Sequence, residues 1–325
     1  MTRTLSIALD RYDRHVPFFL GQVAAPAGYE LKPLEVGMDP PRRDGINRHH
    51  RMLVKREFDI AEVSLASYII GVSRGAAFTA VPAFPRRLFS QNHIFVRRDA
   101  GIRSPSDLAG KRVGLWAFQV TMSVLARGDL KADYGVPWED IVWHTEYDEE
   151  LSASYPGVKI ERMPSGTTAA QWLLEGKLDA YINPHPGFEV TDSPLVKRLF
   201  DNPQTECERY LSRHGHYPIM HLLAIRKELA DTDPALPAAV LGMYQDAVHQ
   251  MEHYHVDPGY STMPFNRFEA ERLRAAGRFG AQLWTSGLAA NRANLERFIG
   301  FMVDQRLLER PIPVDALFHS SVLGT

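Results

Sequence analysis

The sequence predicts an α/β protein built from two similar lobes that face one ligand cleft. The main observation is a phrase that occurs twice, at residues 53–64 and 173–183. Each copy holds the end of an amphipathic helix, then a charged break with an aspartate (Asp59 or Asp179), then a short apolar strand. Such apolar runs are typical of buried parallel strands. The copies are too far apart for a solenoid repeat, so two lobes are the natural interpretation, although helix–turn–strand units occur in any α/β protein.

Length and composition set the second constraint. A chain of 325 residues with 45% hydrophobic residues is long enough for two domains of usual size, each with its own hydrophobic core. The net charge of −2 gives no reason to expect nucleic acid or an anionic membrane as a partner. The one cysteine, Cys207, excludes an internal disulfide and a Cys-based zinc site, which fits a reducing compartment.

The start of the chain predicts where the protein resides. Residues 4–9 already alternate like a strand, and the pattern of a secretory signal is not seen there. No stretch reaches the roughly 20 apolar residues that a membrane span needs. We therefore expect a cytoplasmic protein without a membrane partner, and a homo-oligomer stays open.

The first half of the chain reads as alternating strands and helices. Strands are expected at 4–9, 29–36, 60–64 and 78–84, and a helix at 46–55. A solvated helix face explains most of the basic residues in and around that helix, a set that includes Arg48 and His49, although one of them could lend positive potential to the cleft.

The second half predicts a crossing into another lobe and a return. A strand at 93–97 leads into the second lobe, and the segment 216–225 leads back. The predicted domains are therefore 1–92 plus 222–325 for lobe 1, and 93–221 for lobe 2. Helices near 237–253, 267–284 and 291–308 are expected to pack back on lobe 1.

Candidate binding residues follow the predicted strand ends. Ligands of open α/β sheets bind beyond the carboxyl ends of the strands, which favours Ser64 and Ser67 after one strand and Asn183 and His185 after the other. The next candidates are Arg86 and Arg87, because a guanidinium matches a carboxylate bidentately. Either arginine could instead be an ordinary surface residue.

A predicted helix start offers a further anion site. Its unpaired N–H groups and positive dipole end attract an anion, and the candidates there are Gln119 and Thr121. Plain N-capping by Thr121 is the simpler alternative.

Histidines supply the candidates for proton transfer, since their pKa lies near neutrality. Those at predicted crossings or strand ends are His93, His185, His216 and His221. The segment His249–His253 also matches the H-x-x-E-H pattern of zinc peptidases, but both histidines fall on the wet face of their helix, so we disfavour a metal site.

Four segments together resemble the 4,5-dihydroxyphthalate decarboxylase family. They are residues 58–68, 81–87, 118–121 with Arg127–Gly128, and 217–221, and the similarity runs from the first strand to about Arg226. The resemblance implies the two-lobed fold of type II periplasmic binding proteins. Two departures concern the substrate. Family members commonly carry Arg-His at Ser90–Gln91, and an arginine at His185.

The resemblance implies a cofactor-independent carboxy-lyase acting on a small hydroxylated aromatic carboxylate, with any metal requirement left open. The hypothesis assigns proton transfer to His221 or His185 and the carboxylate to Arg86 or Arg87. The remaining predicted substrate contacts are Ser64, Ser67, Gln119, Thr121, Asn183 and His216. The alternatives are a protein that binds a small aromatic acid without altering it, which the same fold allows, and another lyase or hydrolase.

Overall fold

The computed structural model describes residues 2–37, 47–153, 155–256 and 284–325. The chain divides into two compact units. Unit 1 comprises Met1–Arg86, His221–Leu295 and Ile312–Thr325, and unit 2 comprises Arg87–Met220 and Glu296–Pro311. The predicted domain limits stay predictions, and this division differs from them mainly in grouping Glu296–Pro311 with unit 2. Residues 267–283 of the predicted helix at 267–284 lie outside the described residues. None of the described helices is both long and apolar enough to cross a membrane.

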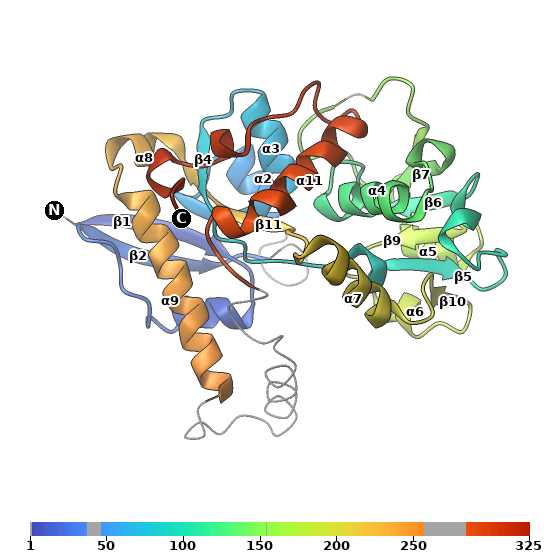
Figure 1. The fold of residues 1–325 in the computed structure, drawn as a ribbon, viewed down its shortest axis with the longest axis horizontal. Coiled ribbons are helices and arrows are strands. Elements are labelled where there is room, and N and C mark those ends of the chain that lie inside the picture. The colour runs from blue at the N-terminus through green and yellow to red at the C-terminus, as the bar shows by residue number, and fades with distance from the viewer. Residues whose placement is uncertain (1, 38–46, 154, 257–283) are drawn as a thin grey trace. The chain divides into compact units, whose positions relative to one another are not determined.

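Unit 1 is built on a five-stranded mixed sheet (Figure 1). Its strand order is β2-β1-β3-β11-β4, and only β11 runs antiparallel to its neighbours. The strands are β1 Arg3–Leu9, β2 Tyr29–Glu35, β3 Ile60–Ser64, β4 Phe78–Val81 and β11 His221–Arg226. The helices are α1 Val16–Phe19, α2 Arg48–Leu53, α3 Leu65–Ser73, α8 Lys227–Thr232 and α9 Leu236–Val256. Every residue of β3 and β4 is buried, which explains why most of their residues are apolar.

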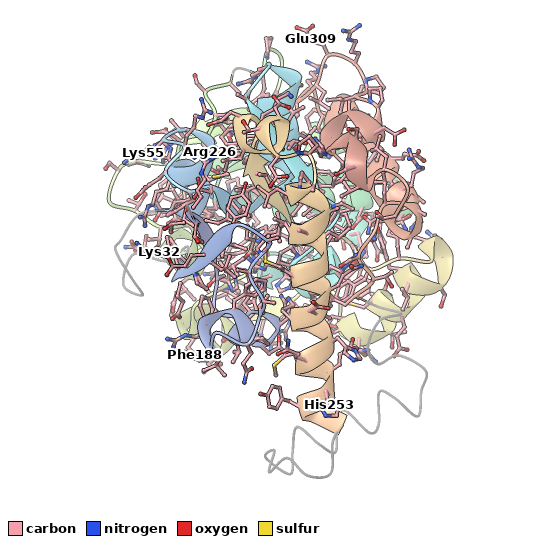
Figure 2. The ribbon with its side chains drawn as sticks, turned by 90° about the vertical axis from the view of Figure 1, so that its left-hand side faces the viewer. Lys32, Lys55, Phe188, Arg226, His253 and Glu309 are labelled. Carbon is pink, nitrogen blue, oxygen red and sulfur yellow. The ribbon has the colours of Figure 1, made fainter. Side chains whose placement is uncertain are left out.

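Helix α9 packs against α1 and β4. It buries Val240, Tyr244 and Ala247, and leaves Asp246 and His249 exposed. Figure 2 shows His253 near the carboxyl end of α9, and this side chain is exposed as well. The prediction that both histidines of the H-x-x-E-H pattern lie on the wet face is therefore confirmed.

Unit 2 is built on a six-stranded mixed sheet with the order β10-β5-β9-β6-β7-β8. Here β5 runs antiparallel to both β9 and β10, and the remaining pairs are parallel. The strands are β5 Ile94–Arg97, β6 Arg112–Leu115, β7 Val142–Thr145, β8 Ile160–Arg162, β9 Ala180–Ile182 and β10 Val196–Arg198. The helices are α4 Thr121–Tyr134, α5 Ala169–Leu174, α6 Phe188–Thr191, α7 Pro203–His214 and, from Glu296 onward, α11 Arg292–Asp304. A core that includes Phe95, Leu173, Leu178 and Tyr181 fills the space between α5 and the sheet.

The repeated phrase has one structural meaning in both units. Asp59 accepts a hydrogen bond from the backbone N–H of Ser6 on the adjacent parallel strand, at 2.8 Å. Asp179 accepts the equivalent bond from the N–H of Arg112, at 2.9 Å. The carbonyl oxygens of the two aspartates accept from the N–H groups of Arg226 and Arg97, the last residues of the antiparallel strands β11 and β5. Each aspartate thus joins a parallel and an antiparallel neighbour at the start of its strand.

A glycine ends the helix in the second copy. Gly176 follows α5 with a φ of +76°, in the left-handed region that glycine adopts without a Cβ clash. The chain then turns directly into Asp179 and β9.

Gly128 is required by close helix packing in unit 2. A Cβ at this position of α4 would lie 2.2 Å from the ring of Phe301 on α11. We expect Gly128→Ala to lower the free energy of unfolding by about 1–3 kcal/mol, because the ring must move away. Gly300→Ala on α11 is the matched control, because no neighbouring side chain lies within 4 Å of the place that a Cβ would take there. The control should cost nothing in urea unfolding, and equal losses for both variants would contradict the packing argument.

Candidate active site

The candidate site of unit 1 lies where three strand ends meet. Strand β1 ends at Leu9 and is followed by Asp10, and β3 ends at Ser64. Strand β11 begins at His221, whose Cα pairs with that of Ser64. Because β11 runs antiparallel, its first residue meets the carboxyl end of β3. The predicted residues Ser64 and His221 therefore lie side by side.

Glu62 is the central charge of this site. It lies on β3, and its side chain is 0% exposed. Its carboxylate accepts a hydrogen bond from Nδ1 of His221, and lies 3.3 Å from Nη2 of Arg48. The backbone N–H of Asp10 donates to the same carboxylate at 3.2 Å. A buried carboxylate needs such partners, since desolvation would otherwise make its charge too costly.

Arg48 and His49 do not lie on the solvated face that the sequence predicts for most of these basic residues. Arg48 is 0% exposed and His49 is 4% exposed. The guanidinium of Arg48 donates to the carbonyl oxygen of Glu62 at 2.9 Å and to that of Val36, and it lies 3.2 Å from the Asp10 carboxylate. Helix α2 packs against β3. This packing and the hydrogen bonds of the guanidinium hold Arg48 inside the unit.

Two more histidines belong to the site. The ring of His49 packs edge-to-face on that of His221, with centroids 4.8 Å apart. His15, which follows β1, is 0% exposed, and its Nδ1 lies 2.8 Å from the carbonyl oxygen of Asp10. Tyr12 lies in the same loop, with its hydroxyl buried. Sequence reasoning did not select His15, His49 or Glu62. The only signal in the sequence was their position: His15 follows a predicted strand, Glu62 lies on one, and His49 lies on the predicted helix before it.

The buried charges set the protonation states at neutral pH. Burial raises the pKa of Glu62, but the Arg48 charge and the hydrogen bond with His221 outweigh it and hold the pKa well below its usual value. Burial lowers the pKa of His221 below its ordinary value, although Glu62 opposes the change. Burial also lowers the pKa of His49, and it brings that of His15 to about 4. The site therefore holds neutral imidazoles beside an ionised carboxylate.

The remaining predicted residues of unit 1 lie around Glu62 and His221. The hydroxyl of Ser64 caps helix α3 by accepting from the N–H of Ser67. The carbonyl oxygen of Arg86 accepts from the N–H of His221 at 3.3 Å. The charge of Arg86 also helps to lower the pKa of both His221 and His49, after burial. Ser64, Ser67, Arg86 and His221 thus belong to one region of unit 1.

Unit 2 contains the other predicted residues, and Arg87 and His216 are near one another there. Arg87 pairs with Ile219 across an isolated bridge and donates to the carbonyl oxygen of Tyr217 at 2.7 Å. His216 is half-buried beside Tyr210. Burial, followed by the charges of neighbours that include Arg87, lowers the pKa of His216 to about 4.

The start of α4 binds a carboxylate of the protein itself. Glu149 accepts from the backbone N–H groups of Phe118 and Gln119, at 2.8 and 3.0 Å. The side-chain amide of Gln119 donates to the carbonyl oxygen of Leu151. Thr121 is the first residue of the helix, and Val120 is its N-cap, so the alternative that Thr121 caps the helix is wrong.

The second strand end of the sequence prediction lies after β9. Asn183 bonds with the hydroxyl of Tyr181, and its side-chain oxygen accepts from the N–H of His185 at 2.8 Å. The side chain of His185 is exposed. Within the described ranges, no group of three or more histidine, cysteine, aspartate or glutamate residues could hold a metal ion.

Comparison with known folds shows which architecture the two units share. A periplasmic sulfonate-binding protein from Methylobacillus flagellatus matches with a TM-score of 0.58 at 14% identity, over 99% of this chain and 93% of that chain. The periplasmic aliphatic sulphonate binding protein of Escherichia coli matches with a TM-score of 0.55 at 12% identity, over the full length of both chains. The α/β fold of periplasmic binding proteins, which the sequence predicts, is therefore confirmed.

Comparison with sequences gives the family. The family model described as NMT1/THI5 like matches residues 34–140. A 4,5-dihydroxyphthalate decarboxylase of Comamonas testosteroni is 34% identical over 98% of this chain and 97% of its own length. A second one, from Pseudomonas putida, is 33% identical over 62% of this chain and 78% of its own length. With such identity over nearly the whole of both chains, the protein belongs to the 4,5-dihydroxyphthalate decarboxylase family.

Proposed function

We propose that the protein is a carboxy-lyase that removes carbon dioxide from a hydroxylated aromatic acid of the phthalate type. The relatives that carry this activity in their names support the reaction class. The observation that carries the proposal is the buried pair of Glu62 and His221. It supplies an oriented, neutral imidazole, which is the group that proton transfer at neutral pH requires.

The chemistry needs one base and one acid. In 4,5-dihydroxyphthalate each carboxylate has a hydroxyl para to it. A base takes the phenolic proton, and an acid delivers a proton to the ring carbon that bears the carboxylate. The ring is then a dienone. The bond to the carboxylate breaks, its electron pair restores the aromatic ring as a phenolate, and carbon dioxide leaves. The phenolate then takes its proton back from the base. One proton is taken up and one carbon dioxide is released for each turnover.

Unit 1 offers residues for the first step. His221 is the base, because its Nδ1 faces Glu62 and its pKa lies below the ordinary value, so that it is unprotonated at neutral pH. Arg86 is the carboxylate clamp, supported by its position beside His221. Ser64 and Ser67 are proposed to contact the substrate from the same strand end.

The predicted roles of the unit 2 residues stay predictions. They are proton transfer for His185, and substrate contact for Arg87, Gln119, Thr121, Asn183 and His216. Ser90, one of the departures from the family pattern, donates to the buried carboxylate of Asp129 at 2.7 Å. This internal bond favours a structural role for Ser90, and leaves the hydroxylated aromatic acid as the substrate class. The cytoplasmic location and a homo-oligomer stay predictions.

A second function has its own support. Neighbours in fold are binding proteins, which supports capture of a small aromatic acid without chemistry. The two functions separate in one experiment with purified protein. It is mixed at neutral pH with 4,5-dihydroxyphthalate and a panel of hydroxybenzoates and hydroxyphthalates, with and without divalent metal.

We expect carbon dioxide release from at least one dihydroxylated acid. A matched series lacking a hydroxyl at the positions both ortho and para to the carboxylate should release no carbon dioxide, because those acids have no route to the dienone. Thermal stabilisation by an acid without release of carbon dioxide would favour the binding protein, since a ligand of the folded state stabilises by mass action alone.

A further inference from the structure

We propose that Glu62 is a positioning residue, which fixes the tautomer of His221 and thereby makes its Nε2 the base. This inference rests on the proposed function for its catalytic consequence. Its structural part, the state of the His221 imidazole, stands on the contacts of unit 1 alone.

The geometry assigns the two ring nitrogens different roles. An ionised carboxylate can only accept hydrogen bonds, so the nitrogen that contacts Glu62 must carry a proton. A neutral imidazole has one protonated nitrogen, and Nε2 of His221 is then left with its lone pair. No hydrogen bond of Nε2 is found to any residue in the described part of the chain. The lone pair is therefore available to a substrate proton.

Glu62 is itself held from several sides. Arg48 lies 3.3 Å from one carboxylate oxygen, and the N–H of Asp10 donates to the same oxygen at 3.2 Å. The other oxygen faces His221. The carboxylate also lies on a strand that is buried along its full length, so it has little freedom to turn. This arrangement resembles the general logic of a base oriented by a third group.

The charge of Glu62 has a second consequence. When His221 accepts a proton it becomes an imidazolium among other cations, because Arg48 and Arg86 both act against its positive charge. The adjacent carboxylate offsets this repulsion. Without the negative charge, the protonated state that follows the first step would be less stable, and kcat would fall.

The test is Glu62→Gln, which keeps the shape of the side chain and removes its charge. We expect kcat to fall at least about tenfold but by less than the 10²- to 10⁴-fold that loss of the base itself would cost, while KM changes by less than roughly threefold. The matched control is Glu161→Gln on β8, whose carboxylate lies 3.6 Å from Nδ1 of His144 in unit 2 and is largely exposed. The control should leave both constants unchanged.

A measurement without turnover decides the structural part. In protein with ¹⁵N-labelled histidine, the His221 signals are assigned by their loss in His221→Asn. The wild type should show a protonated Nδ1 and an unprotonated Nε2. In Glu62→Gln the pKa of His221 should fall further, because the negative charge that raises it is removed and a neutral amide oxygen is a weaker hydrogen-bond acceptor than a carboxylate. An unchanged pKa and tautomer would overturn the proposal, whereas absent carbon dioxide release in the wild type would count against the proposed function only.

Glu62→Gln leaves Arg48 buried without its main counter-charge, so this variant could fail to fold. The double variant Arg48→Met with Glu62→Gln removes both charges together. We expect it to fold and to show a pKa of His221 below that of the wild type, but less lowered than in Glu62→Gln, because loss of the Arg48 charge acts in the opposite direction. A folded double variant whose His221 keeps the wild-type tautomer and pKa would overturn the positioning role.

Discussion

Replacing His221 by asparagine is expected to lower kcat by about 10²- to 10⁴-fold, the range that a positioned acid or base contributes. The asparagine amide can still donate to Glu62 from the place of Nδ1, so the contact that holds the site is kept. What is lost is Nε2, the atom proposed to take the phenolic proton. The measurement is the steady-state release of carbon dioxide from the best acid of the panel.

The matched control for this variant is His249→Asn, the same substitution on the exposed face of α9 in the same unit. It should retain the wild-type kcat and KM. If His221→Asn raised KM and left kcat unchanged, His221 would only bind the substrate.

The pH dependence of kcat follows from the direction of the His221 shift. Burial lowers the pKa of this imidazole below 6.5, and the base must be unprotonated to act. The rate should therefore rise as the pH rises through the lowered pKa, and it should be level near neutrality. A rate that climbs only above pH 7 would contradict the assignment of His221 as the base.

The fold could be predicted from the sequence because the features that indicate it are local patterns in the chain. The two copies of the repeated phrase are visible as patterns of apolar and charged residues, and Asp59 and Asp179 perform the same backbone contacts in the structure. The glycine at 176 also has the left-handed conformation that its position requires. Periodicity and turn chemistry are enough for such features.

The residues at the centre of the site could not be predicted from the sequence, because their contacts are not local in the chain. Arg48 and His49 belong to a run of basic residues, and such a run is typical of a wet helix face. The burial of Arg48 depends on Glu62, which lies on β3, and on Asp10, which follows β1. Glu62 itself is a single charge in an apolar strand. Only the pairing of β11 with β3 brings His221 to it, and no local pattern predicts that pairing.

Replacing Arg48 by methionine is expected to lower the free energy of unfolding by about 3–5 kcal/mol, because one partner of a buried ion pair is removed and the other stays charged. Methionine fills much of the same space without hydrogen bonds, so the loss reports the charge and the bonds to the carbonyl oxygens of Glu62 and Val36. Urea unfolding at neutral pH measures it. The loss should shrink as the pH falls below the ordinary pKa of a glutamate. The wild type then loses the stability that the lowered pKa of Glu62 provides, while the variant can protonate this carboxylate.

Two comparisons make the Arg48 result decisive. Arg56→Met removes a half-exposed arginine whose contact with Glu228 measures 2.6 Å, and it should cost no more than about 1 kcal/mol, since water screens such a pair. The double variant Arg48→Met with Glu62→Gln should lose less free energy of unfolding than the two single variants lose together. The reason is that Glu62→Gln removes the charge that Arg48→Met leaves unpaired. A loss for Arg48→Met as small as that for Arg56→Met, or strict additivity in the double variant, would mean that Arg48 does not hold Glu62 ionised. The orientation of His221 would then need another source.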